Sequence, residues 1–216
     1  GNTMGSMSVM GFEERKKPFG PLIEDVDFIT FNNEEDIQKI TTKTAGIILE
    51  SIQGGAGFIQ PENNFLQKVK QRCEEVGALM IIDEIQPGFG RTGKLFGFQN
   101  YDVVPDIIIL GKGMGGGMPV GAFVASSAHM DLLSNNPKLG HITTFGGHPV
   151  IASACLATLK EITETSLIPD TLAKEKLFRS LLVHPLIKEV RGRGLMLAIM
   201  TEDAEITNQI IFKCQE

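Results

Sequence analysis

The chain has 216 residues and a hydrophobic content of 42%, enough to bury the core of one ordinary globular domain or slightly more. Its formal net charge is −6, and its lysines and arginines are scattered along the sequence. That pattern excludes the concentrated basic face that binding to nucleic acid or to an anionic membrane requires. The longest apolar runs are too short to cross a bilayer, so we expect no membrane segment.

The three cysteines, Cys73, Cys155 and Cys214, are far apart in the sequence. They form neither a disulfide framework nor a CxxC metal site, so we expect a reducing, cytoplasmic location and no metal. The first residues lack the basic start and apolar core of a secretory signal. Because the chain does not begin with Met and stops within a helical pattern, we expect a fragment of a longer protein.

Apolar runs bounded by turn residues alternate with segments of helical period, which is typical of an α/β domain. Three of the runs are almost continuously apolar, as strands covered by helices on both faces are. Strands are predicted at residues 28–31, 46–50, 78–83, 106–110 and 119–126.

The first clear helix is predicted over residues 61–76, because its apolar side chains fall on one stripe and it opens with Pro-Glu. Cys73 lies on this stripe and is expected in the core, and Gly77 is expected to cap the helix. Further helices are predicted at 149–164, after Pro169 and at the end of the chain, and a turn into a strand is predicted over 190–199.

This order predicts two units. Residues 1–165 are expected to form most of a large domain, and residues 166–216 a linker helix and the start of a smaller one.

Three segments place polar groups at strand ends or helix starts, where ligand sites of open α/β sheets collect. In the first, an apolar strand leads Asp83 directly into a glycine-rich loop over residues 83–93. A carboxylate in that position is costly unless it meets a cation or hydrogen-bond donors. A simple helix-capping or turn role for Asp83 remains open from the residues alone.

The second segment places Lys112 at a strand end between two glycines, which allow backbone and ligand to approach closely. Desolvation beside apolar strands would suit Lys112 to Schiff-base chemistry, although a solvated loop lysine is the simpler alternative. Gly111, Gly113 and Gly116 also satisfy the dinucleotide pattern GxGxxG, with Asp131 further on. That pattern requires a helix beginning inside the loop, whereas a strand is predicted to follow.

The third segment, residues 141–149, places hydroxyls and free amides before a predicted helix, as a phosphate-binding patch does. Thr144 is the candidate contact in this segment. An ordinary turn role for Thr144 is the alternative.

Together the three segments resemble the class III, ornithine-type aminotransferases of fold type I. That family carries D-E-V/I-Q-x-G-x-G-R-T-G, then a G/A-K-x-x-x-G-G lysine loop, then S/T-T-Y/F-G-G-N-P. The match runs from Gly1 to the R-G-x-G-L-M run at 191–196 and covers essentially the whole chain. It implies a mostly parallel α/β sheet flanked by helices, the fold type I large domain, followed by the start of a small C-terminal α/β domain.

The resemblance also implies a chemistry, in which an amino donor and a 2-oxo acid exchange an amino group on pyridoxal 5'-phosphate. Lys112 would carry the cofactor as a Schiff base and shuttle a proton, and Asp83 would pair with the protonated pyridine nitrogen. Gln86 would reach the phenolic oxygen of the ring. Thr144 would contact the cofactor phosphate of a neighbouring subunit, which implies a homodimer with a shared active site.

Two positions depart from the family. Gly55 stands where the ornithine and 4-aminobutyrate branches carry an acid that pairs with a substrate-binding arginine, so their ω-amino preference is not implied here. His148 replaces the expected Asn. The phosphate loop is expected upstream of Gly1 and the carboxylate-binding arginine downstream of Glu216, so the chain alone is predicted to be inactive.

Two other functions fit the motifs less well. A glutamate-semialdehyde aminomutase would look different at the position of Gln86 and would lack the G-R-T-G run at 90–93. A catalytically silent relative of the same fold is disfavoured because Lys112 and Asp83 are both retained.

Overall fold

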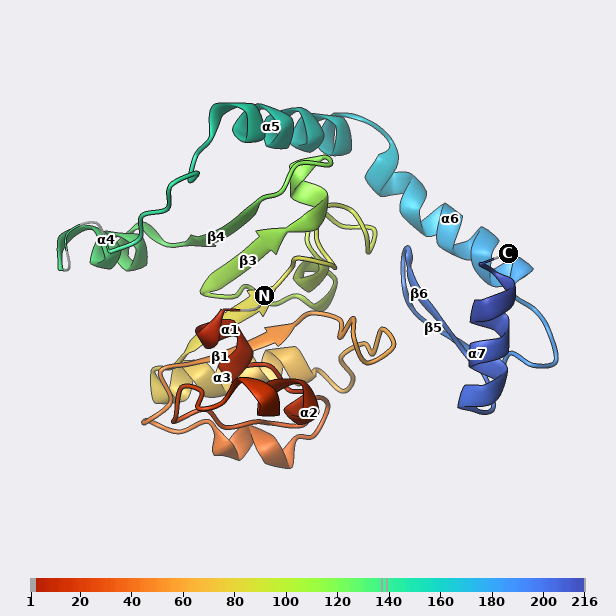
Figure 1. The fold of residues 1–216 in the computed structure, drawn as a ribbon, viewed down its shortest axis with the longest axis horizontal. Coiled ribbons are helices and arrows are strands. Elements are labelled where there is room, and N and C mark those ends of the chain that lie inside the picture. The colour runs from red at the N-terminus through yellow and green to blue at the C-terminus, as the bar shows by residue number, and fades with distance from the viewer. Residues whose placement is uncertain (1–2, 137, 139, 216) are drawn as a thin grey trace.

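The computed structural model describes residues 3–136, 138 and 140–215. Its centre is a four-stranded sheet in the order β1-β2-β3-β4, in which β1, β2 and β3 are parallel and β4 is antiparallel to β3 (Figure 1). The strands are β1 (Gly46–Glu50), β2 (Leu79–Asp83), β3 (Ile107–Gly111) and β4 (Gly121–Ala125). The predicted mostly parallel α/β sheet flanked by helices is confirmed.

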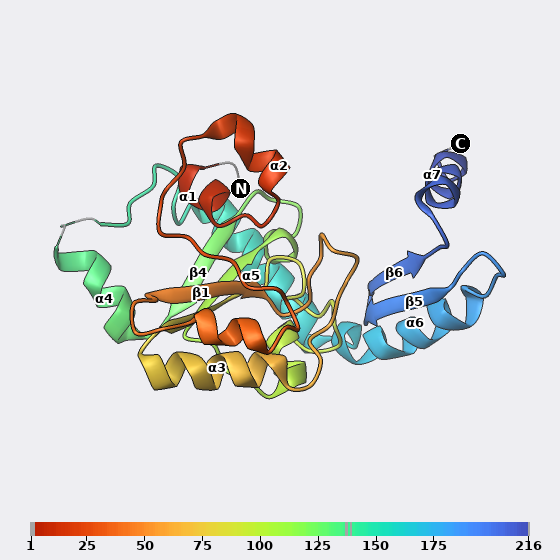
Figure 2. The ribbon, with the colours of Figure 1, turned by 90° about the horizontal axis from the view of Figure 1, so that it is seen from below.

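Helix α3 lies along one side of β1, and the short N-terminal helices α1 and α2 lie on the other (Figure 2). Helix α5 packs against the turn that follows β3, and α6 leads away from the sheet to the β5–β6 hairpin and α7 (Figure 1). No helix among the described residues is long and apolar enough to span a membrane. The helices are α1 (Met4–Ser8), α2 (Glu13–Lys16), α3 (Phe65–Val76), α4 (Ser127–Asn135), α5 (Pro149–Glu164), α6 (Leu167–Leu181) and α7 (Ala204–Lys213). Four short 3-10 helices are η1 (Lys17–Phe19), η2 (Glu35–Lys39), η3 (Gly97–Tyr101) and η4 (Lys112–Gly115).

The hydrophobic core lies between α3 and the sheet. The apolar stripe of α3 is completely buried against alternate residues of β2, as expected when an amphipathic helix covers a strand face. Cys73 belongs to this stripe, and its predicted core position is confirmed. Asp106 links α3 to β2, because its carboxylate accepts from Lys70 Nζ on α3 at 2.8 Å and from the Met80 amide on β2 at 2.8 Å. The opposite face of the sheet is less covered, and Ile48 there is 39% exposed.

The predicted start of the first helix is wrong by four residues. Helix α3 begins at Phe65 and not at Pro61, because Asn63 and Asn64 adopt left-handed backbone angles, with φ of 49° and 58°. Two successive left-handed residues cannot continue a right-handed helix. Gly77 caps α3 with φ of 77°, as predicted.

Most predicted strands are confirmed, and 46–50 matches β1 residue for residue. The strand predicted at 28–31 is wrong. There the Thr30 amide donates to the Asp36 carboxylate at 2.7 Å instead of to a neighbouring strand, while Phe31 packs on Phe65 with ring centroids 5.2 Å apart. The apolar residues that suggested a strand are therefore loop residues that pack on the core.

The C-terminal segment differs from its prediction in one respect. Residues 190–199 form not one strand but most of an antiparallel hairpin, β5 (Glu189–Arg193) and β6 (Met196–Met200). The hairpin turns at Gly194, where φ is 63°, a conformation that favours glycine.

Candidate active site

The carboxyl ends of the parallel strands bring acidic residues and the candidate lysine to one edge of the sheet. Glu50 is the Cα partner of Asp83, and Asp83 is the partner of Ile109. Lys112 follows β3 three residues beyond Ile109. Ligand sites of open α/β sheets form at this edge, so the topology places Asp83 and Lys112 where such a site is expected.

Lys112 adopts an unusual backbone conformation. Its φ is 43°, in the left-handed region, and its side chain is exposed at the first position of η4. For a residue other than glycine this conformation costs about 1–3 kcal/mol, and such strain concentrates at functional sites. The surrounding loop therefore holds the lysine in a conformation that it would not adopt alone.

The glycines of the lysine loop allow it to pack against the acidic loop. A Cβ added at Gly111 would lie 3.5 Å from Ile85, and one added at Gly113 would lie 3.4 Å from Phe89. On the other side, a Cβ added at Gly116 would overlap the hydroxyl of Thr158 on α5. The two sequence segments that contain Asp83 and Lys112 are thus in direct contact.

The dinucleotide interpretation of the same glycines is wrong. The segment after β3 is a single 3-10 turn of four residues, and the chain continues into β4, which runs back antiparallel to β3. The pattern GxGxxG requires the amino end of an α-helix to face a pyrophosphate. The loop offers no such helix.

Asp83 ends β2 half-buried, with one carboxylate oxygen accepting from the Ile85 amide at 2.9 Å. Within the described residues its other oxygen makes no hydrogen bond. The side-chain amide of Gln86 likewise makes no hydrogen bond within the described residues. The ammonium of Lys112 forms no ion pair in the described part of the chain. A carboxylate, an amide and a primary amine at one sheet edge are therefore available to a ligand.

Glu50 is a site residue that the sequence analysis missed. Its Oε1 accepts from the Gly54 amide at 3.2 Å, and a Cβ added at Gly54 would overlap the amide oxygen of Gln86. Burial raises the pKa of Glu50; the Gly54 amide and Lys112 oppose the shift, and Asp83 adds to it. The signal was present in the sequence, because β1 ends in a carboxylate just as β2 does.

Glu84 is a buried anchor of the acidic loop. Its carboxylate accepts from the amides of Gly97 at 2.6 Å and Phe98 at 3.0 Å, which ties the loop to η3. Burial raises the pKa of Glu84, and the hydrogen bonds from these two amides oppose the shift. We assign Glu84 to holding the loop and not to chemistry, since its side chain is completely buried.

Thr144 is not brought to the other candidates within one chain. It is exposed in the turn before α5, and no hydrogen bond or ion pair links it to Lys112, Asp83 or Gln86 in the described residues. His148, the other departure in this segment, is the residue before α5 and makes no side-chain capping bond.

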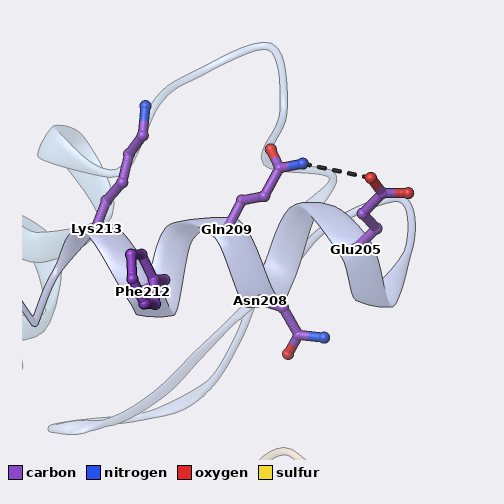
Figure 3. Close-up of a pocket in the computed structure, with 5 residues that line it drawn as sticks. All are labelled: Glu205, Asn208, Gln209, Phe212 and Lys213. Atoms are coloured by element: carbon purple, nitrogen blue, oxygen red, sulfur yellow. Dashed lines mark hydrogen bonds between the residues drawn. The ribbon is translucent and has the colours of Figure 1, made fainter.

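A shallow surface hollow lies elsewhere, along α7 (Figure 3). It holds none of the predicted site residues, and all of its lining residues belong to that one helix: Glu205, Asn208, Gln209, Phe212 and Lys213.

A mostly parallel sheet with a lysine and an aspartate at its carboxyl edge fits the fold type I enzymes, and the solved structures that superpose on the chain belong to that class. The family description "Aminotransferase class-III" matches residues 1–216. The chain belongs to the class III aminotransferase family, whose members depend on pyridoxal phosphate.

Two relatives illustrate the similarity. The [LysW]-aminoadipate semialdehyde/glutamate semialdehyde transaminase of Sulfolobus acidocaldarius is 41% identical over 205 residues, covering 92% of this chain and 52% of that protein. The acetylornithine aminotransferase of Caldanaerobacter subterraneus subsp. tengcongensis is 38% identical, covering 100% of this chain and 55% of its own. The chain spans about half the length of the curated relatives it matches.

Solved structures agree. The ornithine aminotransferase of Toxoplasma gondii ME49 superposes with a TM-score of 0.88 at 28% identity, covering all of this chain and 53% of its own. A second structure of the Toxoplasma gondii enzyme, described as having partial occupancy of PLP at its active site, gives a TM-score of 0.85 at 30% identity over 95% of this chain and 49% of its own. The available amine, carboxylate and amide at the sheet edge fit the same cofactor.

Proposed function

We propose that this chain supplies the lysine and the ring-binding residues of a pyridoxal-phosphate-dependent aminotransferase, which transfers an amino group from an amino-acid donor to a 2-oxo acid. The observation that carries the proposal is Lys112, held in a left-handed conformation between two glycines and in loop contact with the segment of Asp83. A solvated loop lysine would have no need of that strain.

The bound cofactor would supply an electron sink for the carbanion formed at the donor carbon. Lys112 would attach the cofactor covalently through Nζ and, once released, would hold and return a proton at that atom. Asp83 would place a negative charge at the pyridine nitrogen and keep it protonated. Gln86 would donate a hydrogen bond from its free amide to the phenolic oxygen.

The substrates follow from the class of reaction and from the relatives. The names of the relatives specify semialdehyde derivatives of amino acids and acetylornithine. We infer a donor of the amino-acid type and a 2-oxo acid acceptor. The aminomutase alternative is not favoured, because the G-R-T-G run at 90–93 is present and packs on α6.

We also propose a homodimer whose active site takes Thr144 from the partner subunit. Thr144 lies between Ile142 and Phe145, which are 71% and 75% exposed. Apolar side chains exposed to this extent beside a polar candidate suit a surface that another subunit covers. Mixing full-length Lys112→Ala and Thr144→Ala variants should restore activity if each partner supplies one residue, and absence of any recovery would oppose the shared site.

The domain division proposed is 1–165 for the large domain and 166–216 for the linker helix and the start of the small domain. Hairpin β5–β6 forms its own two-stranded sheet, separate from the central one, which supports this division. The proposed location is cytoplasmic, supported by cysteines that form no pair.

The decisive experiment is borohydride reduction of the full-length protein with bound cofactor, followed by peptide mapping. We expect one labelled peptide, which contains Lys112. Label on another lysine would refute the assignment, and the Lys112→Arg variant serves as the unlabelled control.

A further inference from the structure

Glu50 and Asp83 present their carboxylates on the same face of the sheet. They are register partners at the ends of two parallel strands, and residues paired in this way point to the same side. The alternate residues of β1 and β2, such as Leu49 and Ile82, face the core under α3. Glu50 therefore lies on the face of Asp83, away from that core.

The carboxylate of Glu50 fixes the turn that follows β1. Its Oε1 accepts from the amide of Gly54, four residues further on, at 3.2 Å. A Cβ added at Gly54 would lie 3.2 Å from the same oxygen, so Gly54 is held close over the carboxylate. Loss of this acceptor would release the backbone of the turn.

Gly54 in turn lies close to the side chain of Gln86. A Cβ added at Gly54 would overlap the Gln86 amide oxygen, so a side chain at position 54 would have to displace the end of Gln86. The Gln86 amide makes no hydrogen bond of its own within the described residues, and Gly54 is a neighbour that limits where its amide oxygen can lie. The charges of Asp83 and Lys112 both act on Glu50, which places the three groups in one electrostatic cluster.

We propose that Glu50 is a positioning residue of the active site: by binding the Gly54 amide it holds the turn against Gln86 and so aims the Gln86 amide at the cofactor ring. This inference rests on the proposed function, in which Gln86 contacts bound pyridoxal phosphate. Glu50 itself touches neither cofactor nor substrate in this role.

The role predicts a difference between two substitutions. Glu50→Gln keeps an amide oxygen that can accept from Gly54, so it should keep Gln86 in place. Glu50→Ala removes the acceptor and should release both the turn and Gln86. If Glu50 acted through its negative charge alone, the two substitutions would not differ, and Glu50→Gln would be as harmful as Glu50→Ala.

The test uses the full-length enzyme, stripped of cofactor and titrated with pyridoxal phosphate, with the dissociation constant and the absorption maximum of the bound cofactor as readouts. We expect Glu50→Ala to weaken binding by roughly three- to tenfold, the effect of one lost hydrogen bond, and to shift the absorption maximum as Gln86→Ala does. The double variant, Glu50→Ala with Gln86→Ala, should bind pyridoxal phosphate no more weakly than Gln86→Ala alone, because both substitutions remove the same contact between Gln86 and the cofactor. Glu50→Gln should recover most of the affinity.

The matched control is Asp203→Ala at the start of α7. It removes a comparable hydrogen bond, in which the Asp203 carboxylate accepts from the Ile206 amide at 2.8 Å. It should leave both readouts unchanged. If Glu50→Ala does not fold, Gly54→Ala gives the second test, because its new Cβ displaces Gln86 while Glu50 is intact.

Wild-type affinity and spectrum in Glu50→Ala, additive effects in the double variant, or equal effects of Glu50→Gln and Glu50→Ala would each overturn the inference. If only Gly54→Ala folds, a wild-type spectrum in that variant would overturn it as well. Failure of the proposed function would be recognised separately, because the wild-type enzyme would then show no borohydride label on Lys112.

Discussion

The hydroxyl of Thr171 on α6 lies 3.1 Å from the carbonyl oxygen of Gly90, which is 81 residues earlier in the chain. The contact explains the glycines of the G-R-T-G run, because a Cβ at Gly90 would lie 3.0 Å from Ile168 and one at Gly93 would lie 2.9 Å from Leu172. Both glycines also have left-handed backbones. The run therefore packs closely against α6, and this contact holds the start of the C-terminal segment against the acidic loop.

Replacement of Thr171 by Val should destabilise the full-length protein. The substitution keeps the shape of the side chain but removes a hydroxyl that the Gly90 carbonyl, at 3.1 Å, shares with the Leu167 carbonyl, at 3.0 Å. The Gly90 carbonyl still accepts from the Gly93 amide at 3.1 Å, so the cost is that of one hydrogen bond, about 0.5–1.5 kcal/mol. Thr163→Val is the control, since its hydroxyl bonds only the Leu159 carbonyl on the exposed side of α5. Urea unfolding should show the larger loss for Thr171→Val, and equal losses would show that the contact contributes nothing to stability.

Replacement of Gly116 by Ala should separate the lysine loop from α5. Gly116 has φ of 56°, and its new Cβ would overlap Thr158, whereas Gly117 has φ of 98° with open space around it. Both substitutions carry backbone strain of more than about 1 kcal/mol, because Ala disfavours a positive φ. Gly116→Ala adds the overlap with Thr158, so it should cost more stability than Gly117→Ala. Adding Thr158→Ala should recover the difference in thermal unfolding, and no recovery would mean that Thr158 is not the obstacle.

Replacement of Asp83 by Asn should lower turnover without loss of the fold. Asn keeps a side-chain oxygen that can accept from the Ile85 amide, as the Asp83 carboxylate does at 2.9 Å, but it removes the negative charge proposed for the pyridine nitrogen. We expect kcat to fall by roughly 10²-fold or more, the scale of losing a preorganised electrostatic contact. Turnover and urea stability measured together decide the point, and near-normal turnover would show that Asp83 does not face the cofactor.

Replacement of Glu84 by Gln should change how stability depends on pH. Burial raises the pKa of Glu84 above its ordinary value of 4.5, so the folded protein holds this proton more tightly than the unfolded chain does. That contribution to stability is complete below pH 4.5 and is lost as pH rises through the raised pKa.

A glutamine does not titrate, so the stability advantage of the wild type over Glu84→Gln should be largest at low pH and should shrink as pH rises. Free energies of unfolding measured from about pH 4 to about pH 8 test the sign. An advantage that grows with pH would show that the folded state favours the ionised carboxylate. Glu62→Gln, at an exposed position, is the reference variant.

Features set by local sequence could be predicted, and features set by distant contacts could not. β1 and α5 were placed correctly because a continuous apolar run and a Pro-initiated Ala-Leu helix carry their own signals. Residues 28–31 have an equally apolar pattern, yet they pack on Phe65 without a strand neighbour, and no local signal records a missing neighbour.

The same distinction holds for the candidate site. The motif spacing placed Asp83 and Lys112 at adjacent strand ends, and the structure brings their loops into contact through Gly113 and Phe89. The link from Glu50 through Gly54 to Gln86 was missed, because it depends on strand register and on the close approach of Gly54 to Gln86. The roles assigned to Asp83, Gln86, Lys112 and Thr144 remain predictions.

Gly55 is expected to influence the choice of amino donor. Gly55 is exposed, and a Cβ there would make ordinary contact with Phe12 at 3.5 Å, so a side chain can be introduced without strain. Related branches carry an acid at this position, which neutralises a substrate-binding arginine while an ω-amino donor binds. With Gly55 we expect that arginine to lack this acidic partner, which would favour a donor whose carboxylate lies near the reacting amine.

Gly55→Glu should therefore raise the ratio of kcat/KM for an ω-amino acid to kcat/KM for an α-amino acid donor, by roughly three- to tenfold for one screened charge pair. Gly55→Gln is the matched control, because it adds a side chain of nearly the same size without the charge. If both variants shift the ratio equally, the effect is steric and Gly55 does not set donor choice through electrostatics. If Gly55→Glu moves the ratio towards α-amino donors, the introduced carboxylate does not pair with the arginine, and residues other than Gly55 set the specificity.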